Sequence, residues 1–556
     1  MPPKEGTGNA QDFHISAVEP PPYADVVISN DKDNGSIAGD KEGGGVELSR
    51  SLKERHMTMI AIGGTIGTGL FLGSGTALAD GGPAGSLVAY SLVGFMVFFI
   101  MSSLGELATF IPVAGSFNTY GSRFVDPSFG FALGWNYWIS WTITVSTELV
   151  ATGMVIQYWL PNVTGVIWSG MAMAIMFLLN AVSVKGYGEA EYWFSMIKIT
   201  AVIIFIIVGV FTASGVLGGH KYGFENWTSG AGAFPNGIGG IVQSFLVSGF
   251  SFQGTELVGI AAGESENPRR DVPRAIRQVF WRILIFYILA TFVIGLIIPW
   301  DDPRLVQDHD VDDIGMSPFT LVFQRSGLGP AAHVMNAVIL ITVLSAGNSG
   351  LYCCARTLWT LAMENKAPRF LRRVTKRGIP INALIVTTVV STFFFSLSFI
   401  GNKKVYTWLL NVSSMTGFLA WLGIAISHWR FRRAFVAQGY DVGLLPYRAV
   451  MFPIGPLFAG LITTFVIVGQ AIPFNAEPFD PIQFVSSYLG IVMFIIFLVA
   501  WKIIHRTRLV PLVSVDVISD SKYHEDVDGS EDAEEEELSI IQRLSQHVKK
   551  LFSRFF

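Results

Sequence analysis

The chain has 556 residues, of which 51% are hydrophobic and 14% are charged, with a formal net charge of −4 at pH 7. Soluble globular proteins carry about 25% charged residues, so this composition excludes an ordinary soluble protein. The two cysteines, Cys353 and Cys354, are adjacent within an apolar run, a spacing that suits neither a disulfide framework nor a metal site. We therefore expect no metal, no cofactor and no nucleic-acid partner.

Long apolar stretches recur through most of the chain and predict an all-α polytopic membrane protein with twelve transmembrane helices. In chain order they are 57–79, 85–111, 130–158, 164–184, 191–214, 236–262, 278–300, 330–362, 380–401, 405–428, 451–473 and 484–504. They place a transmembrane domain at 56–505, between a disordered cytoplasmic N-terminal tail at 1–55 and a cytoplasmic C-terminal tail at 506–556.

The two tails differ in composition. Residues 1–50 are polar and contain no apolar core of a signal peptide. The C-terminal tail has an acidic stretch at 516–537, which we expect to be disordered. Residues 538–556 then place apolar residues at helical spacing beside basic ones, which predicts an amphipathic helix on the inner leaflet or on the protein's own cytoplasmic face.

Basic residues are concentrated in the loops at 267–282, 364–377 and 429–435. Loops rich in Lys and Arg stay in the cytoplasm, so this side is predicted to be cytoplasmic, and an even number of spans puts both termini there. The sequons at Asn162 and Asn226 then fall in outer loops, which is weak evidence for glycosylation because such tripeptides arise often by chance.

The first apolar segment contains a glycine-rich interruption, MTMIAIGGTIGTGLFL at 57–72. Broken backbone is tolerated within a membrane only where it lines a cavity or is buried in protein. The sixth segment, 241–264, has a second interruption from Ser248 to Glu256. A matched pair of broken helices predicts two inverted five-helix repeats, plus two C-terminal helices, with a binding site for a zwitterion at the midplane. Either stretch alone could be a close-packing helix face.

Three ionisable residues lie within predicted spans, where a charge costs about 2.5–3.5 kcal/mol. Glu148 shares a helical face with Tyr137, Trp141 and Thr144, and this aromatic and acidic face suits a cationic side chain. Lys198 is a candidate proton carrier, because a buried lysine can lose and regain a proton. Packing of the aromatic residues, and a Lys198 side chain that reaches the interface, remain as alternatives.

Glu256 lies at the inner end of the second interruption. It can bond to the half-helix that it helps to start, or receive a cationic group. Glu264, at the membrane edge, is interpreted as a gate or loop contact, and Glu106, at the cytoplasmic end of the second segment, is ambiguous in the same way.

Several strings together resemble amino-acid permeases of the amino acid–polyamine–organocation superfamily, most closely the bacterial lysine-specific and fungal basic amino-acid types. They cover most of residues 50–435, in order, and include ERHMTMIAIGGTIGTGLF (54–71), SLGELATFIPVAGSF (103–117), GEAEYWFSMIK (188–198), FQGTELVGIAAGE (252–264) and MNAVILITVLSAGNSGLY (335–352).

The resemblance implies an inverted-repeat transporter and proton-coupled uptake. It implies that backbone N–H groups of the string Ile66, Gly67, Thr68 and Gly69 bind the substrate α-carboxylate. Carbonyls around Phe250 and Ser251 would receive the α-amine, and Phe250 would gate access.

Other residues match positions that the family uses for selectivity and coupling. Tyr137, Trp141 and Glu256 match residues that shape the lysine site, and Ser140 and Ser413 fall where lysine and arginine carriers vary. Lys198 matches the lysine implicated in proton coupling, with carbonyls of the first segment and the string 345–348 as expected partners.

These features predict a plasma-membrane proton symporter for L-lysine, with L-arginine as a second candidate, and not an enzyme. A broad-range or neutral amino-acid permease is the first alternative, and an amino-acid-sensing receptor of the same fold is the second. The long tails look like fungal tails that carry turnover signals, with Lys4, Lys32 and Lys41 as candidate ubiquitin acceptors and ubiquitin-ligase adaptors as expected partners.

Overall fold

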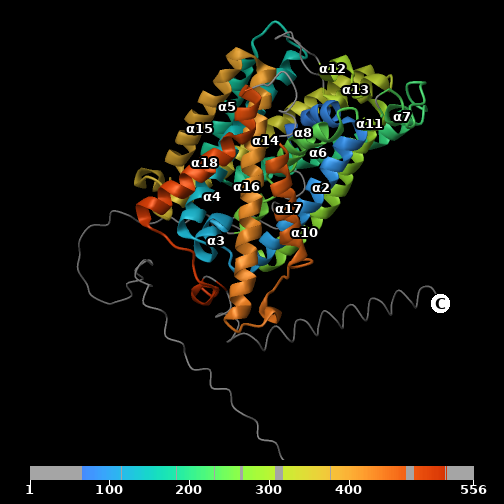
Figure 1. Ribbon diagram of the computed structural model, residues 1–556. Coiled ribbons are helices and arrows are strands. Elements are labelled where there is room, and N and C mark those ends of the chain that lie inside the picture. Colours follow the sequence, from blue (N-terminus) through green and yellow to red (C-terminus); the bar gives the residue numbers. More distant parts are fainter. Residues whose placement is uncertain are drawn as a thin grey trace, which may run out of the picture. The chain divides into compact units, whose positions relative to one another are not determined.

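The computed structural model describes residues 66–113, 115–182, 184–230, 232–262, 267–306, 317–375, 377–470, 481–519 and 521 (Figure 1). The predicted amphipathic helix, the candidate ubiquitin acceptors, Glu264 and the first half of the first apolar segment lie outside these residues, as does the acidic stretch apart from residues 516–519 and 521. Within them the chain is helical and contains no strand.

The membrane-spanning helices follow the predicted apolar segments. They are η3 (Gly69–Gly73) with α2 (Ser74–Phe110), α4 (Pro127–Gln157), α5 (Gly165–Val182), α6 (Val184–Ala213), α8 (Gly237–Phe252) with α9 (Leu257–Ala261), α10 (Pro268–Arg282) with η5 (Ile283–Leu289) and α11 (Ala290–Ile297), α14 (Gly329–Met363), α15 (Ile381–Ser396) with η7 (Leu397–Ile400), α16 (Asn402–Ala437), α17 (Ile454–Gly469) and α18 (Pro481–His505).

By length and composition, eight helical stretches of the described residues can cross a membrane, and Ile285–Ile297 and Ile454–Gly469 are shorter apolar helices. The stretch Gly69–Phe110 holds the first two predicted segments, which meet at Gly82. Gly82 has φ 71°, and a Cβ there would lie 2.2 Å from Pro235 Cδ, so only glycine fits this bend. The predicted polytopic all-α fold is confirmed.

The sixth segment is broken, as its composition predicts, but the break is shorter than expected. Helix α8 continues through Ser248 and Phe250 to Phe252, and only residues 253–256 form the turn before α9. Part of the string that we interpreted as poor helix is therefore helical, because neighbouring helices enclose it: Ser248 and Phe250 are almost fully buried.

Short helices between the spans were not predicted. They are α3 (Ser116–Phe124), α7 (Glu225–Thr228), α12 (Pro303–Val306), α13 (Pro318–Arg325), η6 (Arg369–Arg372), η8 (Val442–Leu444) and η10 (Leu512–Ser514). Helix α13 supports the start of the first span, since Ser317 at its N-terminus donates a 2.6 Å hydrogen bond to the Phe71 carbonyl. The Phe71 and Phe319 rings also pack with centroids 4.6 Å apart.

A buried ion pair joins α2 to the end of α16. Arg432 donates to both oxygens of Glu106, at 2.5 Å from Nε and 2.7 Å from Nη2. The Ala449 N–H donates to the same carboxylate at 2.6 Å, and the His428 Nε2 lies 3.1 Å from it. Glu106 therefore fastens two helices and a loop together at the arginine-rich end of the molecule.

The first residues of the predicted C-terminal tail are packed against the helices. Val510 donates a 2.9 Å backbone hydrogen bond to Val125, and Gln438 donates to the carbonyls of Leu512 and Val515 at 3.0 and 2.7 Å. Arg123 pairs with Asp516 at 2.8 Å. Residues 506–519, which we name the C-terminal strap, thus continue the folded body beyond the last span.

Asp302 forms ion pairs with two arginines at the end of the molecule opposite the arginine-rich end. Its carboxylate lies 2.9 Å from Arg304 Nη2 and 2.6 Å from Arg325 Nη2, and Arg325 also donates to the Ile297 carbonyl at 2.6 Å. Burial alone would raise the pKa of Asp302, but the hydrogen bonds and charge of Arg304, with the charge of Arg325, hold it below its usual value of 3.8.

We expect Asp302→Asn to lower the free energy of unfolding by roughly 1–3 kcal/mol near neutral pH, because a buried charged hydrogen bond is lost. Since the folded-state pKa is lowered, this stabilisation is present above 3.8 and disappears as the pH falls through the lowered value. Thermal unfolding of the detergent-solubilised protein against pH measures it. Asp301→Asn, an exposed neighbour, is the control; equal shifts for both variants would contradict the assignment.

Candidate functional site

A small cavity lies where the first and sixth spans meet helices α4 and α14. Its volume is about 20 Å³, and it is lined by Gly67, Gly69, Trp141, Thr144, Glu148, Phe250, Ser251, Gln253 and Ala346. Eight of these residues come from the two interrupted segments and from the aromatic and acidic face predicted for α4. At this volume the cavity has room for about one water molecule and is too small for an amino acid.

The two interrupted segments touch backbone to backbone. A Cβ on Gly69 would lie 2.5 Å from Ser251 Cα, closer than real Cβ contacts come. Tyr90 of α2 joins the two segments: its hydroxyl donates to the Gly69 carbonyl at 3.2 Å and lies 2.8 Å from Ser251 Oγ. Glycine at position 69 is therefore required by this close approach.

Glu148 occupies the predicted carboxylate cradle. Its Oε1 accepts hydrogen bonds from the Thr68 N–H at 3.3 Å and the Thr68 hydroxyl at 3.1 Å. It lies so close to Gly67 that a Cβ there would be 2.6 Å from Oε1, while Oε2 is buried without a hydrogen-bond partner in the described part of the chain. A protein carboxylate thus uses the donors that the sequence assigned to a substrate carboxylate. Ile66, the first residue of that string, is fully buried.

A network of neutral polar groups closes one side of the cavity. Gln253 Nε2 donates to Ser140 at 2.5 Å, and its Oε1 accepts from Ser413 at 2.9 Å. Ser413 Oγ in turn lies 2.5 Å from Thr144 Oγ1. The two serines predicted at variable positions are therefore connected through Gln253, which sequence reasoning did not select, although an amide inside an apolar span was a usable signal.

Glu256 accepts hydrogen bonds through both of its carboxylate oxygens. Tyr137 and Trp421 donate to its two oxygens at 3.1 Å each, and the Gly254 N–H lies 3.2 Å from both. Of the two roles left open for Glu256, the geometry matches bonding at the break in its own helix. Neither Tyr137 nor Glu256 lines the cavity; Trp141 does, with its indole N–H unpaired among the described residues.

Lys198 is buried beside a carboxylate that sequence reasoning missed. Its Nζ lies 3.4 Å from Glu191 Oε1, and Glu191 Oε2 accepts a 2.7 Å hydrogen bond from Ser345 of α14. Glu191 and Lys198 are seven residues apart and therefore share one face of α6, a spacing that could have revealed the pair. Lys198 reaches the predicted string 345–348 through Glu191, and it is close enough to Glu148 for their charges to interact.

The described residues contain no cluster of three or more His, Cys, Asp or Glu side chains that could hold a metal ion. Cys353 and Cys354 are free thiols and fully buried. What the site offers is a set of backbone donors and carbonyls, one carboxylate with a free oxygen, aromatic faces and a neighbouring buried ion pair. Such a set can bind a charged small molecule and exchange a proton, without covalent chemistry.

The amino acid permease family model matches residues 56–512. The lysine-specific permease LysP of Escherichia coli (strain K12) is 54% identical over 83% of this chain and 95% of its own length. The histidine permease HisP of Lactococcus lactis subsp. cremoris (strain MG1363) is 46% identical over 85% of this chain and 98% of its own length.

Among solved structures, the crystal structure of MhsT in complex with L-phenylalanine superposes with a TM-score of 0.53, covering 80% of this chain and all of that chain at 17% identity. At that identity the likeness concerns the fold alone. The chain is a membrane transport protein and not an enzyme. It belongs to the amino acid permease family, as its sequence motifs predict.

Proposed function

We propose that this protein takes up basic L-amino acids across the plasma membrane together with a proton, with L-lysine as the main substrate and L-arginine as the second candidate. The observation that carries the proposal is the position of Glu148, whose carboxylate is bonded to the first interrupted segment and lines the central cavity together with Trp141 and Phe250. Its similarity to a relative described as lysine-specific supports the choice of substrate.

The two interrupted segments bind the α-carboxylate and the α-amine of the substrate. The substrate α-carboxylate takes over the donors of Thr68, and Glu148 releases them as the cavity opens. The α-amine meets the end of α8 near Ser251. Half-helix ends of this kind hold zwitterions in other transporters built from inverted repeats.

The cationic side chain is then held on the α4 side of the cavity. Trp141 offers a ring face to a cation, and the free oxygen of Glu148 offers a charge. Tyr137 and Glu256 act indirectly. Tyr137 donates a hydrogen bond to Glu256 and packs edge-on against the Trp141 ring, so the two residues hold that ring in place.

The coupled proton is carried by the buried pair of Glu191 and Lys198. Two opposite charges out of water are costly to bury, and the pair can become neutral by moving a proton from the lysine to the carboxylate. Each positive charge that moves inward gains about 2.3 kcal/mol per 100 mV. A proton and a cationic amino acid together move two charges.

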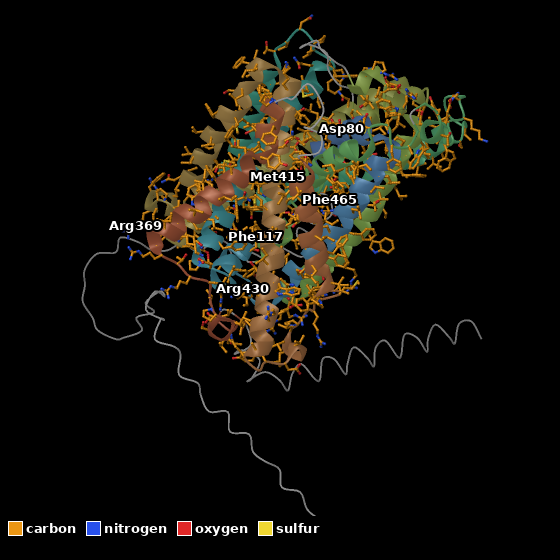
Figure 2. The ribbon with its side chains drawn as sticks, viewed as in Figure 1. Asp80, Phe117, Arg369, Met415, Arg430 and Phe465 are labelled. Atoms are coloured by element: carbon orange, nitrogen blue, oxygen red, sulfur yellow. The ribbon has the colours of Figure 1, made fainter. Side chains whose placement is uncertain are left out.

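The arginine-rich end of the molecule is the cytoplasmic one in this proposal, with both termini on that side. Arg369 and Arg430 lie toward one end and Asp80 toward the other (Figure 2). Basic residues retained on one side favour that orientation. Labelling of an exposed residue at each end from outside intact cells tests it.

Substrate choice is tested by uptake of labelled lysine into liposomes that contain the purified protein, in competition with each of the twenty amino acids. We expect unlabelled lysine and arginine to compete with apparent affinities at least ten-fold tighter than those of neutral amino acids, about 1.4 kcal/mol. Equal competition by neutral amino acids would instead support a broad-range permease. Strong competition by histidine alone would instead support histidine uptake. Histidine uptake is a second candidate function, for which the 46% identity to HisP is the supporting observation.

A further inference from the structure

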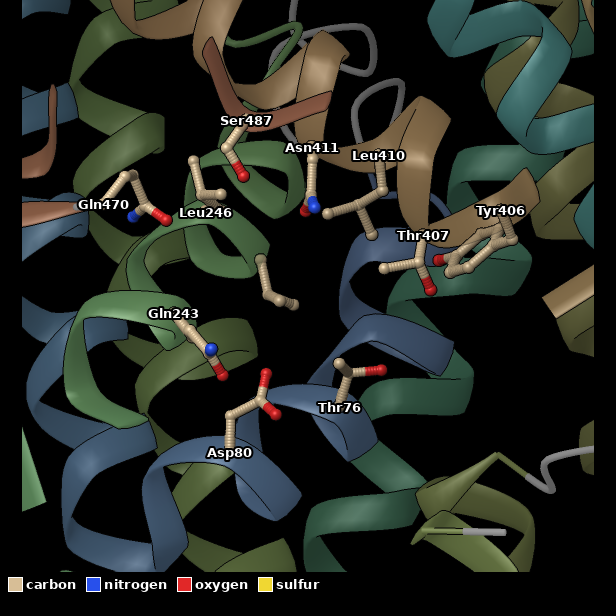
Figure 3. A pocket seen from close by; sticks show the side chains of 11 residues that line it. Thr76, Asp80, Gln243, Leu246, Tyr406, Thr407, Leu410, Asn411, Gln470 and Ser487 are labelled. Carbon is tan, nitrogen blue, oxygen red and sulfur yellow. The ribbon is translucent and has the colours of Figure 1, made fainter. Parts of the chain in front are cut away.

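A second, larger cavity lies in the half of the molecule away from the arginine-rich end. Its volume is about 110 Å³, and helices α2, α8, α16, α17 and α18 contribute residues to it. Figure 3 shows Thr76, Asp80 and Gln243 on one side of this outer cavity and Tyr406, Thr407 and Asn411 facing them from α16.

Three polar side chains that line this outer cavity have no hydrogen-bond partner among the described residues. Asp80, Gln243 and Asn411 make no side-chain hydrogen bond or ion pair within the part of the chain that the structure describes. Asn411 is only 6% exposed, and its amide points into the cavity. Buried polar groups are nearly always hydrogen-bonded, so an amide left unpaired beside a carboxylate indicates a place for a ligand.

The outer cavity leads toward the central one along two helices. On α8, Leu246 and Val247 line the outer cavity, and Phe250, one turn further, lines the central one. Asp80 lies eleven residues beyond Gly69, or about 16 Å along the helix axis. Tyr406 also lines the outer cavity, and its buried hydroxyl has no hydrogen-bond partner among the described residues.

We propose that the outer cavity is a capture site that binds the side-chain ammonium or guanidinium of a cationic amino acid before the molecule moves into the central cavity. The inference rests on the proposed function for its substrate. Asp80 supplies the charge, and the carbonyl oxygens of Gln243 and Asn411 accept from the cationic group.

The lining has apolar surface that suits an organic cation. Leu246, Val247 and Leu410 cover part of the wall, where the methylene groups of a lysine or arginine side chain can pack. Eight of the eleven lining residues carry a side-chain oxygen, so an inorganic cation is the competing occupant that the tests below must separate from an organic one. Asp80 is the one charged side chain among the residues that line the cavity in the described structure.

The first test is transport kinetics in liposomes. We expect Asp80→Asn to raise the KM for lysine roughly five-fold with little change in maximal rate, since a partly exposed ion pair contributes up to about that factor. Asp80→Glu should restore the KM. The wild-type KM should rise with ionic strength, and that of Asp80→Asn should not. Asp301→Asn, on an exposed neighbouring loop, is the matched control.

The second test does not need transport. We expect Asn411→Cys to react several-fold faster with a cationic methanethiosulfonate than with a neutral one of similar size, and Asp80→Asn in the same protein to remove the difference. The native cysteines are fully buried, so the background should be low. Added lysine should slow the cationic reagent.

These tests separate the capture site from the proposed function. A wild-type protein that transports no cationic amino acid would overturn the proposed function, and the reagent preference would still decide whether Asp80 makes the cavity cation-selective. A preference that persists without Asp80, or an Asp80→Asn variant whose KM and salt dependence match the wild type, overturns the capture site. Protection by sodium chloride but not by lysine at equal ionic strength overturns it in favour of an inorganic cation site.

Discussion

Gly69→Ala should reduce amino-acid uptake at least ten-fold for every substrate. The added Cβ would lie 2.5 Å from Ser251 Cα and 2.8 Å from the Ser251 nitrogen, so the clash is with backbone and no side chain can rotate away. Overpacking of this kind costs about 1–3 kcal/mol, and here it must separate the two interrupted segments that form the cavity. Initial rates in liposomes at equal protein density measure the effect.

Gly170→Ala is the matched control for this prediction. The same atom is added to a membrane-spanning helix, but nothing lies within 4 Å of the new Cβ, so uptake should equal that of the wild type. Removing the Ser251 hydroxyl in a Gly69→Ala/Ser251→Gly protein should not restore uptake, because the nearest atom is Ser251 Cα. Full restoration would mean that the hydroxyl, and not the backbone, limits the approach.

Lys198→Met should abolish pH-driven accumulation of lysine while leaving exchange of internal for external lysine measurable. Loss of Lys198 also leaves Glu191 as a buried carboxylate with the Ser345 hydroxyl but without its ammonium partner. An unpaired buried charge destabilises a protein by about 3–5 kcal/mol, so the single variant should also unfold at a lower temperature.

The double variant Glu191→Gln/Lys198→Met separates structure from coupling. With both charges gone, most of the lost thermal stability should return, while pH-driven accumulation stays absent. Accumulation against a gradient by either variant would contradict a role of this pair in proton coupling. A double variant as unstable as Lys198→Met would show that the pair is not the main electrostatic contact of Lys198.

Much of the fold could be predicted because the bilayer imposes strong local constraints. Long apolar segments, a glycine-rich start and a polar turn at 253–256 are all properties of neighbouring residues in the chain. The shared face of Trp141, Thr144 and Glu148 follows from helical periodicity alone, and all three residues do line the cavity.

The rest depends on how distant helices cross. Nothing local in the chain brings Gln253, in the turn after α8, against Ser140 of α4 and Ser413 of α16, or places Glu148 on the Thr68 N–H. The sequence pattern does not single out Asp80, because this residue falls at a segment boundary, where a carboxylate is usually solvated. Only its position across from Asn411 makes it a candidate site.

The C-terminal strap limits where the chain can be shortened without damaging the carrier. Arg123 holds Asp516 and the Ser519 carbonyl, and Val515 and Val517 are almost fully buried, so these residues belong to the carrier itself. A deletion that starts at 506 would expose apolar surface and could be mistaken for a trafficking defect. Cuts placed after Ser519 keep that surface covered and leave the remaining residues as the segment to exchange between permeases.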